Sequence, residues 1–147
     1  SNEPGVQLGI NGFLSNHRPV EPLEIMNELR EKCPWDKKQT TESLREKTIE
    51  EVYELSEAII NNDNKNIEEE LGDLFLHIVF YAKIGSEKKQ FTLNSIINKL
   101  IIKLKKRHPH VYGKLIINSI KEVEQNWEKI KKKVVLVLVL KSVPKFK

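Results

Sequence analysis

Cysteine is nearly absent from the sequence: Cys33 is the single one among 147 residues. One cysteine excludes an internal disulfide framework and fits a reducing compartment. No opening segment resembles a signal peptide, so we expect a cytoplasmic protein. The opening pair Ser1 and Asn2 is typical of a scar left by tag removal and is excluded from the predicted fold.

Long apolar runs and strand-like patterns are also missing. The longest apolar run, Val134–Leu140, is far shorter than the roughly 20 residues that cross a bilayer, so no membrane association is expected. No segment before residue 134 alternates apolar and polar residues with the period of a strand. With 147 residues, of which 39% are apolar, the chain suits one soluble domain with its own core.

Apolar residues recur instead at the i, i+3/i+4 spacing of amphipathic helices. The stripes predicted to face inward are Leu23, Met26 and Leu29; Leu44, Thr48, Val52, Leu55, Ala58 and Ile59; Ile67, Leu71, Leu74, Phe75, Ile78 and Ala82; and Leu93, Ile96, Ile97, Leu100, Ile101 and Leu104. Pro22 suits the first turn of a helix, Thr40 or Thr41 the cap of the next, and Pro109 a helix stop. The CPWD segment at 33–36 is expected to separate the first two helices. The predicted helices cover residues 22–32, 41–60, 67–86, 93–108 and 119–133. The sequence therefore predicts an all-α fold, a small antiparallel helical bundle.

The two ends of the chain fall outside this pattern. Residues 1–20 carry glycine, proline and asparagine without a period and are predicted to be a flexible extension. Residues 134–147, VVLVLVLKSVPKFK, could extend the last helix, pair as a strand or stay disordered, and are left unassigned. The predicted domain accordingly covers residues 21–133.

Charge is distributed unevenly along the chain. From Glu42 to Asp73 there are eleven acidic and three basic residues, whereas Lys99 to Lys133 holds eleven basic and three acidic ones. An acidic middle and a basic C-terminal third suit a cation site beside a polyanion site. Two solvated faces that attract each other would give the same distribution, so charge alone leaves the choice open.

Glu51 is out of place in the second predicted helix. At roughly 100° per residue it projects within about 20–40° of Leu44 and Leu55, inside the apolar stripe. Glu50 points about 100° away, and Glu54 lies on the shoulder of the stripe. A buried carboxylate takes up a proton or finds a cation, because an unpaired buried charge is costly. Glu51 therefore needs a partner.

The third predicted helix repeats this pattern, with Glu70, Asp73 and His77 in an i, i+3, i+7 row beside its apolar stripe. A short connection makes the second and third helices antiparallel neighbours, so two pairs of carboxylates would face each other. Such a cluster repels itself unless a divalent cation lies between its members. All-oxygen ligation selects a hard ion, Mg²⁺ or Mn²⁺.

Other interpretations of these groups carry less weight. E-x-x-E pairs also occur by chance on solvated helices, but two inward pairs on adjacent helices do so less often. A di-iron centre requires Glu-x-x-His on two helices, whereas His77 follows Asp73 by four residues and the second helix has no histidine. His108-Pro-His110 has no third and fourth ligand nearby, so it is interpreted as a helix stop and not as a zinc site.

Four motifs follow one another along the chain: CPWD-x-x-QT at 33–40, EE-x-x-E at 50–54, E-x-x-D at 70–73 and KRHPHVYG at 106–113. In this order they resemble the MazG family of nucleoside triphosphate pyrophosphohydrolases, over about residues 22–130. The resemblance implies an all-α fold that dimerises into a larger bundle, bound Mg²⁺, and hydrolysis of an NTP to NMP and pyrophosphate. The metal ligands it implies are the carboxylates that the helix geometry also indicates, Glu51, Glu54, Glu70 and Asp73.

Candidate substrate contacts lie mainly in the C-terminal third. Lys99, Lys103 and Arg107 form a column that can neutralise a triphosphate, although a helix C-terminus favours cations in any case. In MazG-like enzymes the corresponding residues contact phosphates, which implies this role for Lys103 and Arg107. The resemblance also implies that Trp127 faces the nucleobase, with core packing as the alternative. His77 is a further candidate contact, with a satisfied helix histidine as the alternative.

The implied reaction is metal-assisted phosphoryl transfer, in which Mg²⁺ neutralises phosphate charge and activates a bound water. Glu50, Glu51 and Glu54 are the predicted catalytic residues, and Glu50, turned outward, is the candidate base. A narrower specificity for dUTP, dCTP or an oxidised base stays open. The chain departs from the family in its tail, and in having one MazG-type domain where many members have two.

Two other classes of protein compete with this hypothesis. A helical nucleic-acid-binding module using KLKKRHPHVYGK would bind without divalent metal and with a steep salt dependence, but it leaves Glu51 unexplained. A purely structural dimerisation bundle is the other.

The third helix is apolar almost all round, because Leu76, Val79 and Phe80 lie on flanks away from Ile67 and Leu71. Such a helix is buried on more than one side. We therefore expect at least a homodimer with each active site near the interface. The alternative is that the first helix or the tail covers this surface within one chain.

Overall fold

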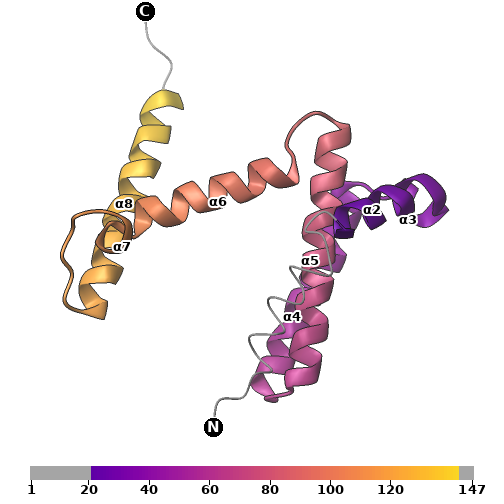
Figure 1. Ribbon diagram of the computed structural model, residues 1–147, viewed down its shortest axis with the longest axis horizontal. Coiled ribbons are helices and arrows are strands. Elements are labelled where there is room, and N and C mark those ends of the chain that lie inside the picture. The colour runs from indigo at the N-terminus through magenta and orange to yellow at the C-terminus, as the bar shows by residue number, and fades with distance from the viewer. Residues whose placement is uncertain (1–20, 143–147) are drawn as a thin grey trace, which may run out of the picture. The chain divides into compact units, whose positions relative to one another are not determined.

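The computed structural model describes residues 21–142, with side chains described for residues 22–137. These residues form helices and no strand, which confirms the all-α prediction (Figure 1). The helices are α2 (Glu21–Lys32), α3 (Pro34–Lys38), α4 (Thr41–Ile60), α5 (Asn64–Glu87), α6 (Leu93–Arg107), α7 (Pro109–Tyr112) and α8 (Ile120–Ser142). Across residues 21–142, no helix combines the length and apolarity needed to cross a membrane. The extension predicted at 1–20 and the end of the tail at 143–147 lie outside the described residues.

The chain divides into two compact units, Ser1–Leu93 and Asn94–Lys147. In the first unit α4 and α5 lie side by side, and α2 packs against both α5 and α3 (Figure 1). Only residues 61–63 connect α4 to α5, so these two helices are antiparallel neighbours, as predicted. The second unit contains α6, α7 and α8.

Side chains at the helix ends set the limits of α4 and α5. Thr40 and Ser43 form a capping box, in which each hydroxyl oxygen accepts from the other residue's amide, at 3.0 and 2.9 Å. Asp63 caps α5 by accepting from the Asn66 amide at 3.2 Å. Because of this cap, α5 begins at Asn64, three residues before the predicted start. Asn62 has a left-handed φ of 53°, which asparagine adopts more readily than most residues.

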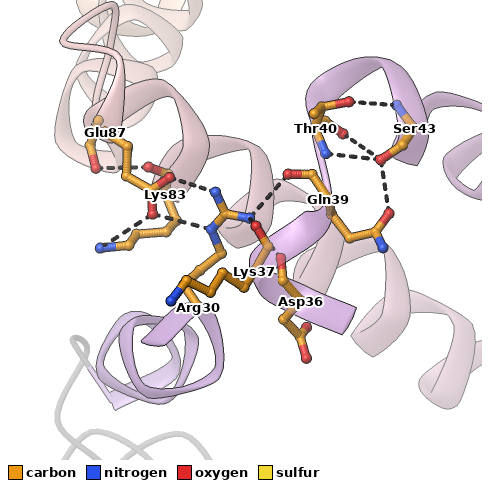
Figure 2. A network of polar contacts seen from close by, with 9 residues as sticks. Arg30, Asp36, Lys37, Gln39, Thr40, Ser43, Lys83 and Glu87 are labelled. Atoms are coloured by element: carbon orange, nitrogen blue, oxygen red, sulfur yellow. Dashed lines mark hydrogen bonds and ion pairs between the residues drawn. The ribbon is translucent and has the colours of Figure 1, made fainter. Parts of the chain in front are cut away.

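Arg30 ties α3 to the end of α5. Its Nη1 donates to the main-chain oxygens of Asp36, Lys37 and Gln39, at 2.6, 3.0 and 3.0 Å. Its Nε and Nη2 donate to the Glu87 carboxylate at 3.1 and 2.6 Å (Figure 2). The Arg30 side chain is only 12% exposed. These bonds fix the segment that leads into α4. The predicted break at CPWD is confined to Cys33, because Pro34 begins the short helix α3.

The core of the first unit agrees only in part with the predicted helical stripes, which contain Met26 and Leu44 but not Val79, Phe80 or Ile84. Its buried cluster is Met26, Leu44, Val79, Phe80 and Ile84. Val79 and Phe80 lie on the flanks of the third predicted helix away from Ile67 and Leu71, and both are buried, as expected for a helix that is covered on more than one side. Met26 of α2 is buried in the same cluster, so α2 covers this side of α5 within one chain.

Other apolar positions predicted to face inward stay about half exposed within the chain. In α4 and α5 these are Val52, Ile59, Leu71, Phe75 and Ile78. In α6, which has no buried residue, they are Ile97, Leu100, Ile101 and Leu104. Each unit taken by itself therefore leaves much of its predicted apolar surface uncovered.

The last helix resolves part of the tail. α8 continues past Lys133 to Ser142, so residues 134–142 extend the last helix. This is one of the three arrangements that the sequence leaves open. At the other predicted stop, α6 ends at Arg107 and Pro109 opens the short helix α7, as expected for a proline there.

Candidate metal centre

Three carboxylates from α4 and α5 converge in the first unit. Glu51, Glu70 and Asp73 each place one carboxylate oxygen so that all three oxygens lie within 4.8 Å of one another. Glu51 comes from α4, and the other two come from α5, one helical turn apart. The antiparallel pairing of the two helices therefore brings together three of the four metal ligands predicted from the sequence.

Two oxygens of this cluster are buried without a partner. The Oε2 atoms of Glu51 and Glu70 form no hydrogen bond within the described part of the chain. A buried acceptor with no donor is costly, because it has lost its water without replacement. Carboxylate oxygens are the ligands that Mg²⁺ and Mn²⁺ prefer. The donor set thus fits a hard divalent cation.

The electrostatics of the cluster favour protonation when no cation is bound. Burial raises the pKa of Glu51, and the charges of Asp73, Glu54 and Glu50 raise it further, against the hydrogen bond with Glu70. Burial, the hydrogen bond with Glu51 and the surrounding carboxylates raise the pKa of Glu70 to about 7. Both raised pKa values reflect the cost of holding these carboxylates charged beside one another, and a divalent cation would remove that cost.

The other two predicted catalytic residues lie on exposed positions of α4. Glu54 is exposed and stands outside the group of three converging oxygens, although its charge contributes to the raised pKa of Glu70. Glu50 is also exposed, as its position on the helix predicts. The roles assigned to both residues stay predictions.

His77 is the one buried polar residue of the described core, with 8% exposure. Its Nδ1 lies 2.7 Å from Thr48 Oγ1, and Thr48 Oγ1 lies 2.5 Å from the hydroxyl of Tyr81. Burial lowers the pKa of His77, against the opposing charge of Asp73. Thr48 occupies a position of the apolar stripe, and the helical pattern does not predict this hydrogen-bonded group. A polar residue at a stripe position, one turn before Glu51, is the signal that could have shown it.

In the second unit, two cationic side chains lie near the ring of Trp127 in α8. The Arg107 guanidinium and the Lys131 ammonium lie 5.8 and 5.6 Å from the centre of its ring. The ring of His108 meets it edge-on at 5.3 Å. These contacts are cation–π and aromatic interactions. Trp127 is partly buried, and its Nε1 is buried without a hydrogen-bond partner in the described residues.

The predicted basic column lines one groove of the second unit. Lys99, Lys103 and Arg107 border a cavity of about 300 Å³ together with Lys106, Ile102, Ile130 and Val134. The groove thus lies between α6 and α8, and both basic and apolar side chains line it. The rings of His108 and His110 are 5.7 Å apart. Within residues 22–137 the group of metal-binding side chains that converges contains neither histidine.

Comparisons with known proteins agree with this architecture. The family model of the MazG nucleotide pyrophosphohydrolase domain matches residues 39–112. A crystal structure of a mazG-related protein from Thermotoga maritima superposes with a TM-score of 0.65 at 35% identity, over 76% of this chain and 96% of that one. These matches show that the chain, with its all-α fold and facing acidic helices, belongs to the MazG family.

Curated relatives extend the comparison. The Nucleoside triphosphate pyrophosphohydrolase/pyrophosphatase MazG of Thermotoga maritima is 47% identical over 113 residues, 76% of this chain and 43% of that protein. The Nucleoside triphosphate pyrophosphohydrolase of Escherichia coli K12 is 41% identical over 74% of this chain and 43% of its own length. YabN of Bacillus subtilis, an uncharacterized protein, is 44% identical over 74% of this chain and 22% of YabN. The chain thus spans less than half the length of each of these three relatives.

Proposed function

We propose that this chain hydrolyses nucleoside triphosphates to nucleoside monophosphates and pyrophosphate, with Mg²⁺ as cofactor and Mn²⁺ able to replace it. The observation that supports this most is the convergence of Glu51, Glu70 and Asp73 with two buried, unpartnered oxygens. The family match and the printed names of the Thermotoga and Escherichia relatives support the same reaction.

The chemistry divides among the residues of α4 and α5. Bound Mg²⁺ would supply charge neutralisation for the phosphates and a water of lowered pKa. Glu51, Glu70 and Asp73 would hold it, together with Glu54 from the next turn of α4. Glu50, exposed beside the cluster, takes the proton from the attacking water.

Substrate binding is assigned to the second unit. Lys103 and Arg107 neutralise the triphosphate, and Trp127 lies against the nucleobase. The common groove of the two basic residues supports this assignment, and so does the contact of Arg107 with the Trp127 ring. His77 is the remaining predicted substrate contact. Base specificity stays open between the common nucleotides, dUTP, dCTP and an oxidised base.

The functional form is at least a homodimer, with each active site near the subunit interface. The half-exposed apolar side chains of α5 and, separately, of α6 support this proposal, since monomers rarely leave large apolar faces exposed. α2 covers Val79 and Phe80 within the chain, so a second copy is needed only for the remaining surface.

A panel of common and damaged NTPs, incubated with Mg²⁺, tests the reaction. We expect chromatography to show NMP and pyrophosphate in equal amounts. Binding to DNA in chelator, with a steep loss of affinity as salt rises, would instead favour the nucleic-acid-binding module.

A further inference from the structure

Thr48 is the centre of a hydrogen-bond group that joins α4 to α5. Its Oγ1 donates to the Leu44 main-chain oxygen at 3.0 Å. The same oxygen atom also lies at hydrogen-bond distance from His77 Nδ1 and from the Tyr81 hydroxyl. A hydroxyl has one hydrogen and two acceptor positions, so among three partners it donates to one and accepts from the other two.

This geometry fixes where the hydrogens lie. The Leu44 carbonyl can only accept, so it takes the single hydrogen of Thr48. With all three contacts formed as hydrogen bonds, the Tyr81 hydroxyl and His77 Nδ1 both donate to Thr48 Oγ1. This arrangement assigns the hydrogen of His77 to Nδ1.

The second ring nitrogen of His77 is consequently an acceptor. The lowered pKa of this buried ring favours the neutral form, in which Nε2 keeps its lone pair. In the described part of the chain, no hydrogen bond occupies Nε2. The ring is also held by its edge contact with Tyr81, at 6.4 Å and 75°.

This group adjoins the carboxylate cluster. Thr48 lies one helical turn before Glu51 on α4, and His77 lies one turn after Asp73 on α5. The charge of Asp73 opposes the effect of burial on the pKa of His77.

We propose that Thr48 and Tyr81 are positioning residues that hold His77 as its Nδ1–H tautomer, so that Nε2 accepts a hydrogen bond from a hydroxyl donor at the carboxylate centre. The donor is a sugar hydroxyl of the substrate or the attacking water. This inference rests on the proposed hydrolysis of nucleoside triphosphates.

The tautomer is tested without any substrate. Nitrogen-15 NMR of histidine-labelled protein separates protonated from unprotonated ring nitrogens, with His77→Gln providing the assignment. We expect the Nδ1–H tautomer in the wild type and a mixture in Thr48→Val, which keeps the shape of threonine but lacks its hydroxyl. Thr48→Ser should restore the wild-type spectrum. An Nε2–H tautomer in the wild type would overturn the proposal, even if the enzyme proves active.

The activities of two His77 variants then show which of the two ring nitrogens catalysis requires. In His77→Gln the side-chain amide reaches the position of Nε2, whereas in His77→Asn it reaches only that of Nδ1. We expect kcat/KM to fall about tenfold in the asparagine variant, the scale of one lost hydrogen bond, and to fall less in the glutamine variant. An asparagine variant at least as active as the glutamine variant would contradict the proposal. Melting temperatures identify any variant that loses activity by unfolding.

Substrates with and without sugar hydroxyls identify the group that donates to His77 Nε2. If a sugar hydroxyl is the donor, the difference between His77→Asn and wild type disappears with 2′,3′-dideoxynucleoside triphosphates. If water is the donor, the difference stays the same with every sugar. A wild type that hydrolyses no NTP would refute the proposed function, while the NMR result would still decide the tautomer.

Discussion

At the scale of single residues, the molecule is defined by carboxylates that repel one another. Glu51 and Glu70 have raised pKa values because they are buried beside each other and beside further acids. The position of Glu51 could be predicted from the sequence, since a glutamate inside an apolar stripe is visible in the helical period. The Thr48–His77–Tyr81 group could not, because its bonds join residues about 30 positions apart and depend on the register of α4 against α5.

Removing one carboxylate of the cluster should separate catalysis from folding. Glu51→Gln or Asp73→Asn is expected to lower turnover more than about a hundredfold, since losses outside the ligand shell already cost 10–100-fold. Without metal both variants should be as stable as the wild type or more so, because like-charge repulsion is relieved. Turnover assays and thermal unfolding with and without Mn²⁺ measure both effects.

The exposed Glu57→Gln substitution on the same helix is the matched control and should leave rate and stability unchanged. Mn²⁺ should raise the melting temperature of the wild type and of this control but not of Glu51→Gln. Wild-type turnover in Glu51→Gln would mean that the ligand assignment is wrong.

At the scale of helices, the sequence predicts where the helices lie along the chain, but not which face of each helix is buried. Helical period and capping residues predict α4 and α5 to within a few residues. Which side of α5 forms the core depends on α2, which docks on Val79 and Phe80 and leaves Phe75 and Ile78 half exposed. The amphipathic pattern contains no information about that docking, because α5 is apolar on more than one side.

The contact of α2 and α3 with α5 should depend on Arg30. Arg30→Met removes five hydrogen bonds to Glu87 and to three main-chain oxygens. We expect a loss of about 2–4 kcal/mol in the free energy of unfolding, because one partner of a partly buried pair stays behind. Urea unfolding measures it. Lys32→Met is the control, since its ion pair with Glu28 is exposed and 3.8 Å long; a similar loss there would refute the role of Arg30.

The same pair predicts a pH dependence. The hydrogen bond from Arg30 lowers the pKa of Glu87 in the folded protein below its ordinary value of about 4.3. A carboxyl whose folded pKa is depressed stabilises the fold above the unfolded value, and this stability is lost as pH falls through the folded pKa. The difference in the free energy of unfolding between the wild type and the Glu87→Gln variant should therefore be constant near neutral pH and shrink below about pH 4. A difference that grows on acidification would contradict this prediction.

At the scale of the whole molecule, the uncovered apolar face of α6 should hold two copies together. Leu100→Asp places a charge in this face, where Leu100 is 50% exposed within one chain. We expect the variant to be monomeric by light scattering at micromolar concentrations, while the wild type is at least a dimer. Asn98→Asp adds the same charge at another exposed position of α6 and is the control. A wild type that is a stable, active monomer would refute the dimer.

The central claim is a cation-dependent hydrolysis at the carboxylate cluster, and identification of the products tests it most directly. Incubation of the protein with an NTP and Mg²⁺, followed by chromatography of nucleotides and phosphates, should yield NMP and pyrophosphate, and excess chelator should abolish both. NDP with orthophosphate as the products, or undiminished turnover in chelator, would contradict the claim.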